Sequence, residues 1–112
     1  MFPIIPLRRL RSSKRVAALV ARVVEASHQP LLDRALSGAL GLSAGQAKGY
    51  IRAWSRGIVR RQVAIAVPVS APFEAQLRDE LTVRATRDVV NRVYWEAMRA
   101  RAARGTAQRR AA

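Results

Sequence analysis

The chain has 112 residues, which predicts a single small domain, and its 21 basic and 7 acidic residues give a formal net charge of +14. It has no cysteine and one histidine, which excludes a disulfide scaffold, a thiol nucleophile and a zinc site built on cysteine or paired histidines. No apolar run approaches the roughly 18 residues that a membrane span needs. We therefore expect a small helical protein that has no catalytic site or cofactor and binds an anionic polymer.

The positive charge is concentrated in three segments that contain no acidic residue. Residues 1–24 carry six basic side chains, residues 34–73 carry six and residues 97–112 carry five, whereas residues 74–96 are nearly neutral. A GC-rich genome explains the preference for arginine over lysine, but it does not remove aspartate and glutamate. Acid-free segments of this length favour binding to a nucleic acid, with DNA preferred over RNA.

The chain begins with a basic arm at residues 1–13, where Pro3 and Pro6 are expected to prevent a helix. The arm contains three candidate phosphate contacts, Arg8, Arg9 and Arg11. An arginine-rich start followed by an amphipathic segment is also typical of a mitochondrial targeting peptide or of a helix on a membrane surface, and both alternatives stay open.

Two helices are predicted after the arm, over about 14–28 and 30–40. Apolar residues three and four positions apart define the first, and Pro30 suits the first turn of the second. His28 falls at the end of the first helix and is interpreted as a solvated side chain rather than a catalytic one.

A third helix is predicted from Ser43 to about Arg61. Ser43 and Gln46 have the spacing of a capping box, which marks a helix start. Tyr50 and Trp54 fall on the apolar side of this helix, so we expect them to pack in the core rather than to stack on bases.

Four basic residues recur at every fourth position of this helix and form one row: Lys48, Arg52, Arg56 and Arg60. Helical spacing places the row on the side opposite the apolar residues. Solvated helix faces usually mix charge signs, and like charges one turn apart repel each other. Because an anion would relieve this repulsion, the row is the main candidate site, with Arg61 beside it.

The stretch from Leu36 to Ile51 resembles a helix-turn-helix. It has apolar residues where two helices would cross, Ser37 as the small residue at the close crossing, Gly41 in the turn and a capped second helix. The resemblance covers residues 31–69 and includes a following wing of the winged-helix kind. It implies that the second helix enters the major groove of duplex DNA, with Ser43, Gln46 and Arg52 nearest the bases.

Two glycines depart from this pattern. Gly45 and Gly49 occupy positions that the resemblance assigns to groove contacts, yet they have no side chain with which to read a base. They either let a phosphate backbone approach the helix, which gives weakly sequence-specific binding, or they let another helix pack there.

The remaining segments alternate between extended and helical patterns. Residues 62–70 alternate apolar and small side chains, which predicts a short strand and at most one strand pair. A last helix is predicted from Pro72 to about residue 103, with a break near Thr82–Thr86 as the alternative, followed by a disordered basic tail at 104–112. Because the helix is apolar on two sides, we expect a homodimer formed through residues 73–100.

Together these features predict an all-α protein with a long C-terminal helix: a single helical domain at residues 14–103 with a helix-turn-helix centre at 31–61. The expected function is non-enzymatic DNA binding in the cytoplasm, in association with the nucleoid. The alternative is a basic structural subunit of a larger RNA- or protein-containing assembly.

Overall fold

The computed structural model describes residues 4–68 and 72–111, and it describes the side chains from Lys14 onward except those at 69–73, 108 and 111. Three helices follow one another: α1 (Ile4–Gly38), α2 (Ala44–Ala66) and α3 (Pro72–Ala111). Each helix packs against the other two, and no strand occurs within the described ranges. The fold is an all-α three-helix bundle, which confirms the predicted fold class and the long C-terminal helix.

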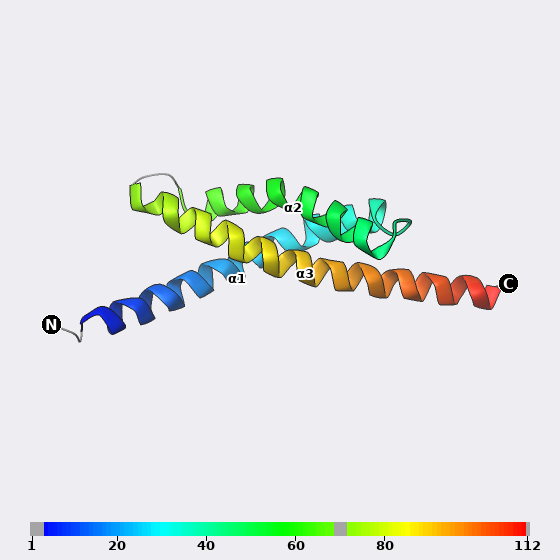
Figure 1. The fold of residues 1–112 in the computed structure, drawn as a ribbon, viewed down its shortest axis with the longest axis horizontal. Coiled ribbons are helices and arrows are strands. Elements are labelled where there is room, and N and C mark those ends of the chain that lie inside the picture. Colours follow the sequence, from blue (N-terminus) through cyan, green and yellow to red (C-terminus); the bar gives the residue numbers. More distant parts are fainter. Residues whose placement is uncertain (1–3, 69–71, 112) are drawn as a thin grey trace.

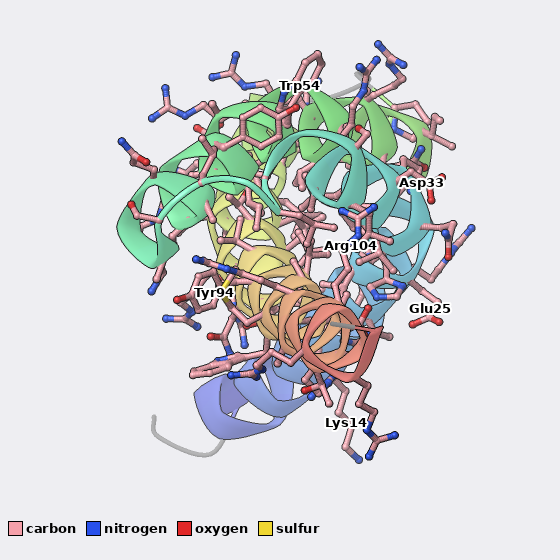
Figure 2. All side chains as sticks on the ribbon, turned by 90° about the vertical axis from the view of Figure 1, so that its right-hand side faces the viewer. Lys14, Glu25, Asp33, Trp54, Tyr94 and Arg104 are labelled. Atoms are coloured by element: carbon pink, nitrogen blue, oxygen red, sulfur yellow. The ribbon has the colours of Figure 1, made fainter. Side chains whose placement is uncertain are left out.

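The core is built almost entirely from valine, alanine and a few larger aliphatic side chains. Viewed along the long axis of the molecule, α2 and the C-terminal half of α1 lie side by side with α3 below them (Figure 2). The largest fully buried side chains are Leu31, Ile51 and Leu81, one from each helix. The helices therefore share one hydrophobic core, and each depends on the other two for the burial of its apolar stripe.

The first helix is continuous, which corrects the expectation of an arm for residues 4–13 and of two helices at 14–28 and 30–40, while residues 1–3, including Pro3, lie outside the described residues. Pro6 falls in the first turn of α1, where a backbone N–H has no helical partner and proline is tolerated. Pro30 lies inside the helix and costs about 3 kcal/mol. The buried stripe continues across it from Ser27 to Leu31, so tertiary packing offsets that cost.

The second helix begins as predicted and ends later than predicted. Ser43 is its N-cap, and both hydrogen bonds of the capping box with Gln46 are present. The helix continues to Ala66, so the expected strand is wrong for residues 62–66, while residues 69–70 lie outside the described residues. Val63 and Val67 lie one helical turn apart and are both buried. They extend the buried stripe of α2 through a segment whose sequence also has the alternating pattern of a strand.

The link between the first two helices is a helical hairpin. Residues 39–43 form the turn, after which α2 runs back beside the C-terminal half of α1 (Figure 1). The structure does not show the steep crossing that the helix-turn-helix resemblance implies, and it has no strand for a wing within residues 4–68 and 72–111. The close approach in the hairpin is at Gly38, where an added Cβ would collide with the Tyr50 hydroxyl, rather than at the exposed Ser37.

The third helix begins at Pro72, as predicted, but it has no break near Thr82–Thr86 and continues to Ala111 instead of ending in a disordered tail. Alanine and arginine dominate its last part, and both have high helix propensity. Most of the apolar side chains on its two flanks are covered by α1 and α2 of the same chain, whereas Val83 and Trp95 stay exposed. No described side chain beyond Ala97 is buried, and Figure 1 shows this end of α3 leaving the bundle of a molecule that extends over 71 Å.

Candidate nucleic-acid interface

The basic row of α2 lies at the edge of its buried face. Each of the four cations directly follows a buried residue in the sequence, the pairs being Ala47–Lys48, Ile51–Arg52, Ser55–Arg56 and Val59–Arg60. Successive helical residues are separated by about 100° around the axis, so the row is that far from the centre of the buried stripe. This corrects the expectation that the row lies opposite the core: it lies beside α3.

All four cations of the row line a groove between α2 and α3, with a volume of about 780 Å³. The facing wall is formed by residues of α3: Thr82, Val83, Thr86, Arg87, Asp88, Val90 and Asn91. Val83 is 69% exposed, an unusual value for a valine in the middle of a helical bundle. The structure therefore combines a row of positive charges with an accessible, largely uncharged wall.

The cations of the row have no acidic partner within the described residues. Lys48 is half-buried, and its ammonium lies 5.5 Å from the centre of the Tyr94 ring, while Arg52, Arg56 and Arg60 are exposed. The one acid in the groove lining is Asp88, whose carboxylate lies 3.9 Å from the guanidinium of its neighbour Arg87. The row therefore retains the mutual repulsion of four positive charges, which an anionic ligand would lower.

Other arginines of the bundle do have acidic partners. On the opposite side of α3, a second groove lies between α1 and α3 and is lined by both acids and arginines. There the Arg92 guanidinium lies 3.4 Å from the Glu25 carboxylate, and Arg84 lies 3.5 Å from Glu80. These ion pairs lie within α3 or between α1 and α3, and none of them involves α2.

The other candidate residues are not all brought to the groove. Ser43 and Gln46 are exposed at the start of α2, but their polar atoms bond to each other: Gln46 N donates to Ser43 Oγ at 3.3 Å, and Ser43 N donates to Gln46 Oε1 at 3.2 Å. Arg61 is exposed and is not part of the groove lining. The backbone of Arg8, Arg9 and Arg11 is helical, and their side chains lie outside the described residues.

The two glycines lie on the exposed face of α2, next to the cation row. A Cβ atom added at Gly45 or Gly49 would meet nothing within 4 Å, and the same holds for Gly57 further along the helix. No described part of this chain packs on these glycines, so the space above them is open to a ligand or to another molecule. Both explanations drawn from the sequence remain available.

Of the two aromatic residues of α2, Tyr50 packs against the core as expected, whereas Trp54 lies outside it, which corrects the expected packing of the tryptophan. Tyr50 is half-buried against Gly38, and Trp54 is 40% exposed with the Arg34 guanidinium 4.1 Å from its ring centre. Ser55 takes the expected place of an apolar residue in the buried stripe, because its hydroxyl donates to the Arg52 carbonyl at 2.7 Å and needs no other partner. A pattern of hydrophobic residues alone does not predict that a serine occupies this buried position.

The single histidine is part of the packing between helices. His28 lies within α1 rather than at a helix end, and its Nε2 atom is 2.8 Å from the Glu96 carboxylate of α3. Both side chains are half-buried. This corrects the expectation of a solvated histidine and gives it a structural role.

Neither a metal site nor a membrane span is found among the residues that the structure describes. There is no group of three histidine, cysteine, aspartate or glutamate residues that could hold a metal ion, and none of the helices combines the length and apolar character needed to cross a bilayer. Comparison with known proteins finds no matching family model, no similar curated protein and no similar solved structure.

Proposed function

We propose that this protein binds nucleic acid without acting as an enzyme, and that it holds the phosphate backbone with the cation row of α2. The observation that carries the proposal is the alignment of four cations, one helical turn apart and without acidic partners among the described residues, along one groove. The row from Lys48 to Arg60 spans about 18 Å of helix, long enough to contact several successive phosphates.

The charge at both ends of the chain supports the same function. The N-terminal part of α1 and the last part of α3 are free of acids, and Arg99, Arg101 and Arg104 are exposed. Such cations increase affinity for any polyanion and the rate of association without reading sequence. DNA remains the first expectation and RNA the alternative.

The position of the row favours contacts to phosphates over contacts to base edges. A recognition helix reads the major groove with side chains on its outer face, where this helix has Gly45 and Gly49. The cations lie instead at the edge of α2, beside α3. We therefore propose that the protein binds nucleic acid with little sequence preference and without inserting a helix-turn-helix into duplex DNA.

Fluorescence anisotropy with a labelled oligonucleotide tests the proposal across a range of salt concentrations. The double variant Arg52→Gln/Arg56→Gln is expected to bind at least about 10-fold more weakly and to lower the slope of log affinity against log salt by about 2. The matched control Arg84→Gln/Arg92→Gln removes the same charge from the other side of α3. Equal losses from the two pairs, or no loss from either, would contradict a specific role for the row.

A second candidate function is favoured by the free end of α3. Beyond Ala97 this helix has exposed arginines and no buried side chain among those described, a form suited to insertion into a larger RNA- or protein-containing assembly. A competition of duplex DNA, single-stranded DNA and RNA for the purified protein separates the two functions. A protein that prefers structured RNA and gains little from the α2 row would favour the assembly role.

Homodimerisation through residues 73–100 stays a proposal. Its original basis, a helix with two apolar sides, is explained by the packing of α1 and α2 against α3 in one chain. Val83 and Trp95 are the large apolar side chains that remain exposed on this helix in the described part of the chain. A mass measurement in solution, with and without nucleic acid, decides between a monomer and a dimer.

A further inference from the structure

The two walls of the α2–α3 groove have different chemistry. The α2 wall presents the four cations, whereas the α3 wall presents mainly neutral side chains, among them Val83, Thr86 and Asn91. Arg87, the one cation of the α3 wall, has Asp88 beside it. A duplex presents two phosphate strands and hides the faces of its bases, whereas a single strand has phosphates on one side and exposed bases on the other. The asymmetry of the groove matches the single strand.

An aromatic pair lies on α3 one turn beyond the groove lining, towards the Lys48 end, and is not itself part of that lining. Tyr94 and Trp95 follow the groove residues Val90 and Asn91 by one helical turn. The Lys48 ammonium lies 5.5 Å from the Tyr94 ring centre, which places this tyrosine next to the end of the cation row. Figure 2 shows Tyr94 on the flank of the bundle formed by α2 and α3.

Trp95 is the accessible member of this pair. Its ring centre lies 5.3 Å from that of Tyr94 in an edge-to-face arrangement, and the residue is 56% exposed. Tyr94 is half-buried and packs against the core, so it supports the tryptophan from one side. A large, exposed and oriented indole beside a cation row is the arrangement with which proteins that bind single strands stack on bases.

We propose that the groove binds a single strand of nucleic acid, with its phosphates along the α2 row, its bases toward α3, and one base stacked on Trp95 at the Lys48 end. This inference rests on the proposed function and adds the class of strand and the stacking residue. Trp54, on the α1 side of α2 and covered by the Arg34 guanidinium, has no part in it.

The chain contains two tryptophans, so single-tryptophan variants give a site-specific test. Trp54→Phe leaves Trp95 as the reporter, and Trp95→Phe leaves Trp54. Titration with a short oligothymidylate is expected to quench the emission of the first variant and to leave that of the second unchanged. A hairpin duplex with the same number of phosphates is expected to produce little quenching in either variant.

Affinity measurements complete the test. Trp95→Ala is expected to weaken binding of the oligothymidylate by about 10-fold and to leave duplex binding unchanged, while Trp95→Phe restores most of the affinity. Because Trp95 is exposed, circular dichroism should show an unchanged fold in both variants. Trp54→Ala is the matched control and should bind normally.

The outcomes separate this inference from the function on which it rests. If the duplex binds as tightly as the single strand, depends on Arg52 and Arg56, and leaves Trp95 emission unchanged, nucleic-acid binding stands and the single-strand inference is wrong. If neither probe binds, both are wrong. If Trp54→Ala weakens single-strand binding as much as Trp95→Ala does, the stacking site is wrongly assigned.

Discussion

The two grooves on either side of α3 show how the same side chain serves two purposes in one small protein. In the α1–α3 groove, Arg92 faces Glu25 and the charges pair between helices. In the α2–α3 groove, four cations stand in a row with no acidic partner among the described residues. Exposed ion pairs contribute little stability, so the pairing in the first groove serves mainly to balance charge. The second groove leaves its positive charge available to a ligand.

Charge reversal on either side of α3 is expected to have the largest effect on binding. Arg56→Glu and Arg92→Glu lower the net charge equally, but only the first places an acid within the cation row. We expect Arg56→Glu to weaken nucleic-acid binding on the order of 100-fold, because a like charge is brought against the phosphates. Arg92→Glu should change affinity by less than about 3-fold. Anisotropy titrations of both variants at the same salt concentration decide it, and similar losses would show that only net charge matters.

Glycine-to-alanine substitutions test how closely a phosphate backbone approaches α2. Gly49 lies between Lys48 and Arg52, and Gly57 lies between Arg56 and Arg60, so both are next to the cation row, and an added Cβ meets nothing at either position. Both variants should raise the free energy of unfolding by about 1 kcal/mol, because alanine is the better helix former. If a phosphate backbone approaches the helix closely along the row, both variants should weaken binding by several-fold. Denaturant titrations and binding curves on the same samples separate the effect on stability from the effect on affinity, and an affinity equal to that of the unsubstituted protein in both variants would exclude a close backbone approach.

A substitution at the N-cap of α2 tests whether Ser43 contacts the bases. Ser43→Ala removes the capping hydrogen bond and should lower the free energy of unfolding by about 1 kcal/mol. Because the Ser43 hydroxyl is already engaged with the backbone of Gln46, nucleic-acid affinity should stay the same once the variant is folded. A change of sequence preference in Ser43→Ala would contradict this and would return Ser43 to the binding surface.

The smallest expected effect concerns the acid that both grooves share. Asp88 lines each of them and is the one acid on the α3 wall of the cationic groove. Asp88→Asn should raise affinity for nucleic acid by about 2-fold, since a screened, exposed like charge is removed. Asp79→Asn, an exposed change outside both groove linings, is the matched control. Equal gains in affinity from the two variants would show that Asp88 has no specific effect on binding in the groove.

The sequence predicts the helical class, the start of α2 and the start of α3, because each rests on a local signal such as a capping box or a proline in the first turn. It does not predict that α1 continues through Pro30 or that α2 continues to Ala66. In both places, buried residues recur about every fourth position and pack against the other two helices. This packing outweighs the local preference for a helix end at Pro30 and for an extended segment at residues 62–66. Such a contribution depends on partners that a local pattern cannot specify.

The sequence predicts that the four cations form one row, but it places that row on the wrong side of α2. The prediction puts the row from Lys48 to Arg60 opposite the core because it counts Tyr50 and Trp54 as core residues. The structure uses Ser55 instead, since this serine satisfies its own hydroxyl within the helix and is small enough for a close helix contact. Because Ser55 rather than Trp54 faces the core, α2 is rotated about its axis relative to the prediction. The row therefore lies at the edge of a groove rather than opposite the core.

The bond between Arg101 and the carbonyl of Leu42 marks where α3 stops being held by the bundle. It is 2.9 Å long and joins the last part of the helix to the turn between α1 and α2. The ten residues that follow, 102–111, are fewer than the roughly 12 to 15 that sustain an isolated helix in water. Their amide protons should therefore exchange with solvent far faster than those of residues 81–97, and a polyanion that neutralises the arginines should slow that exchange.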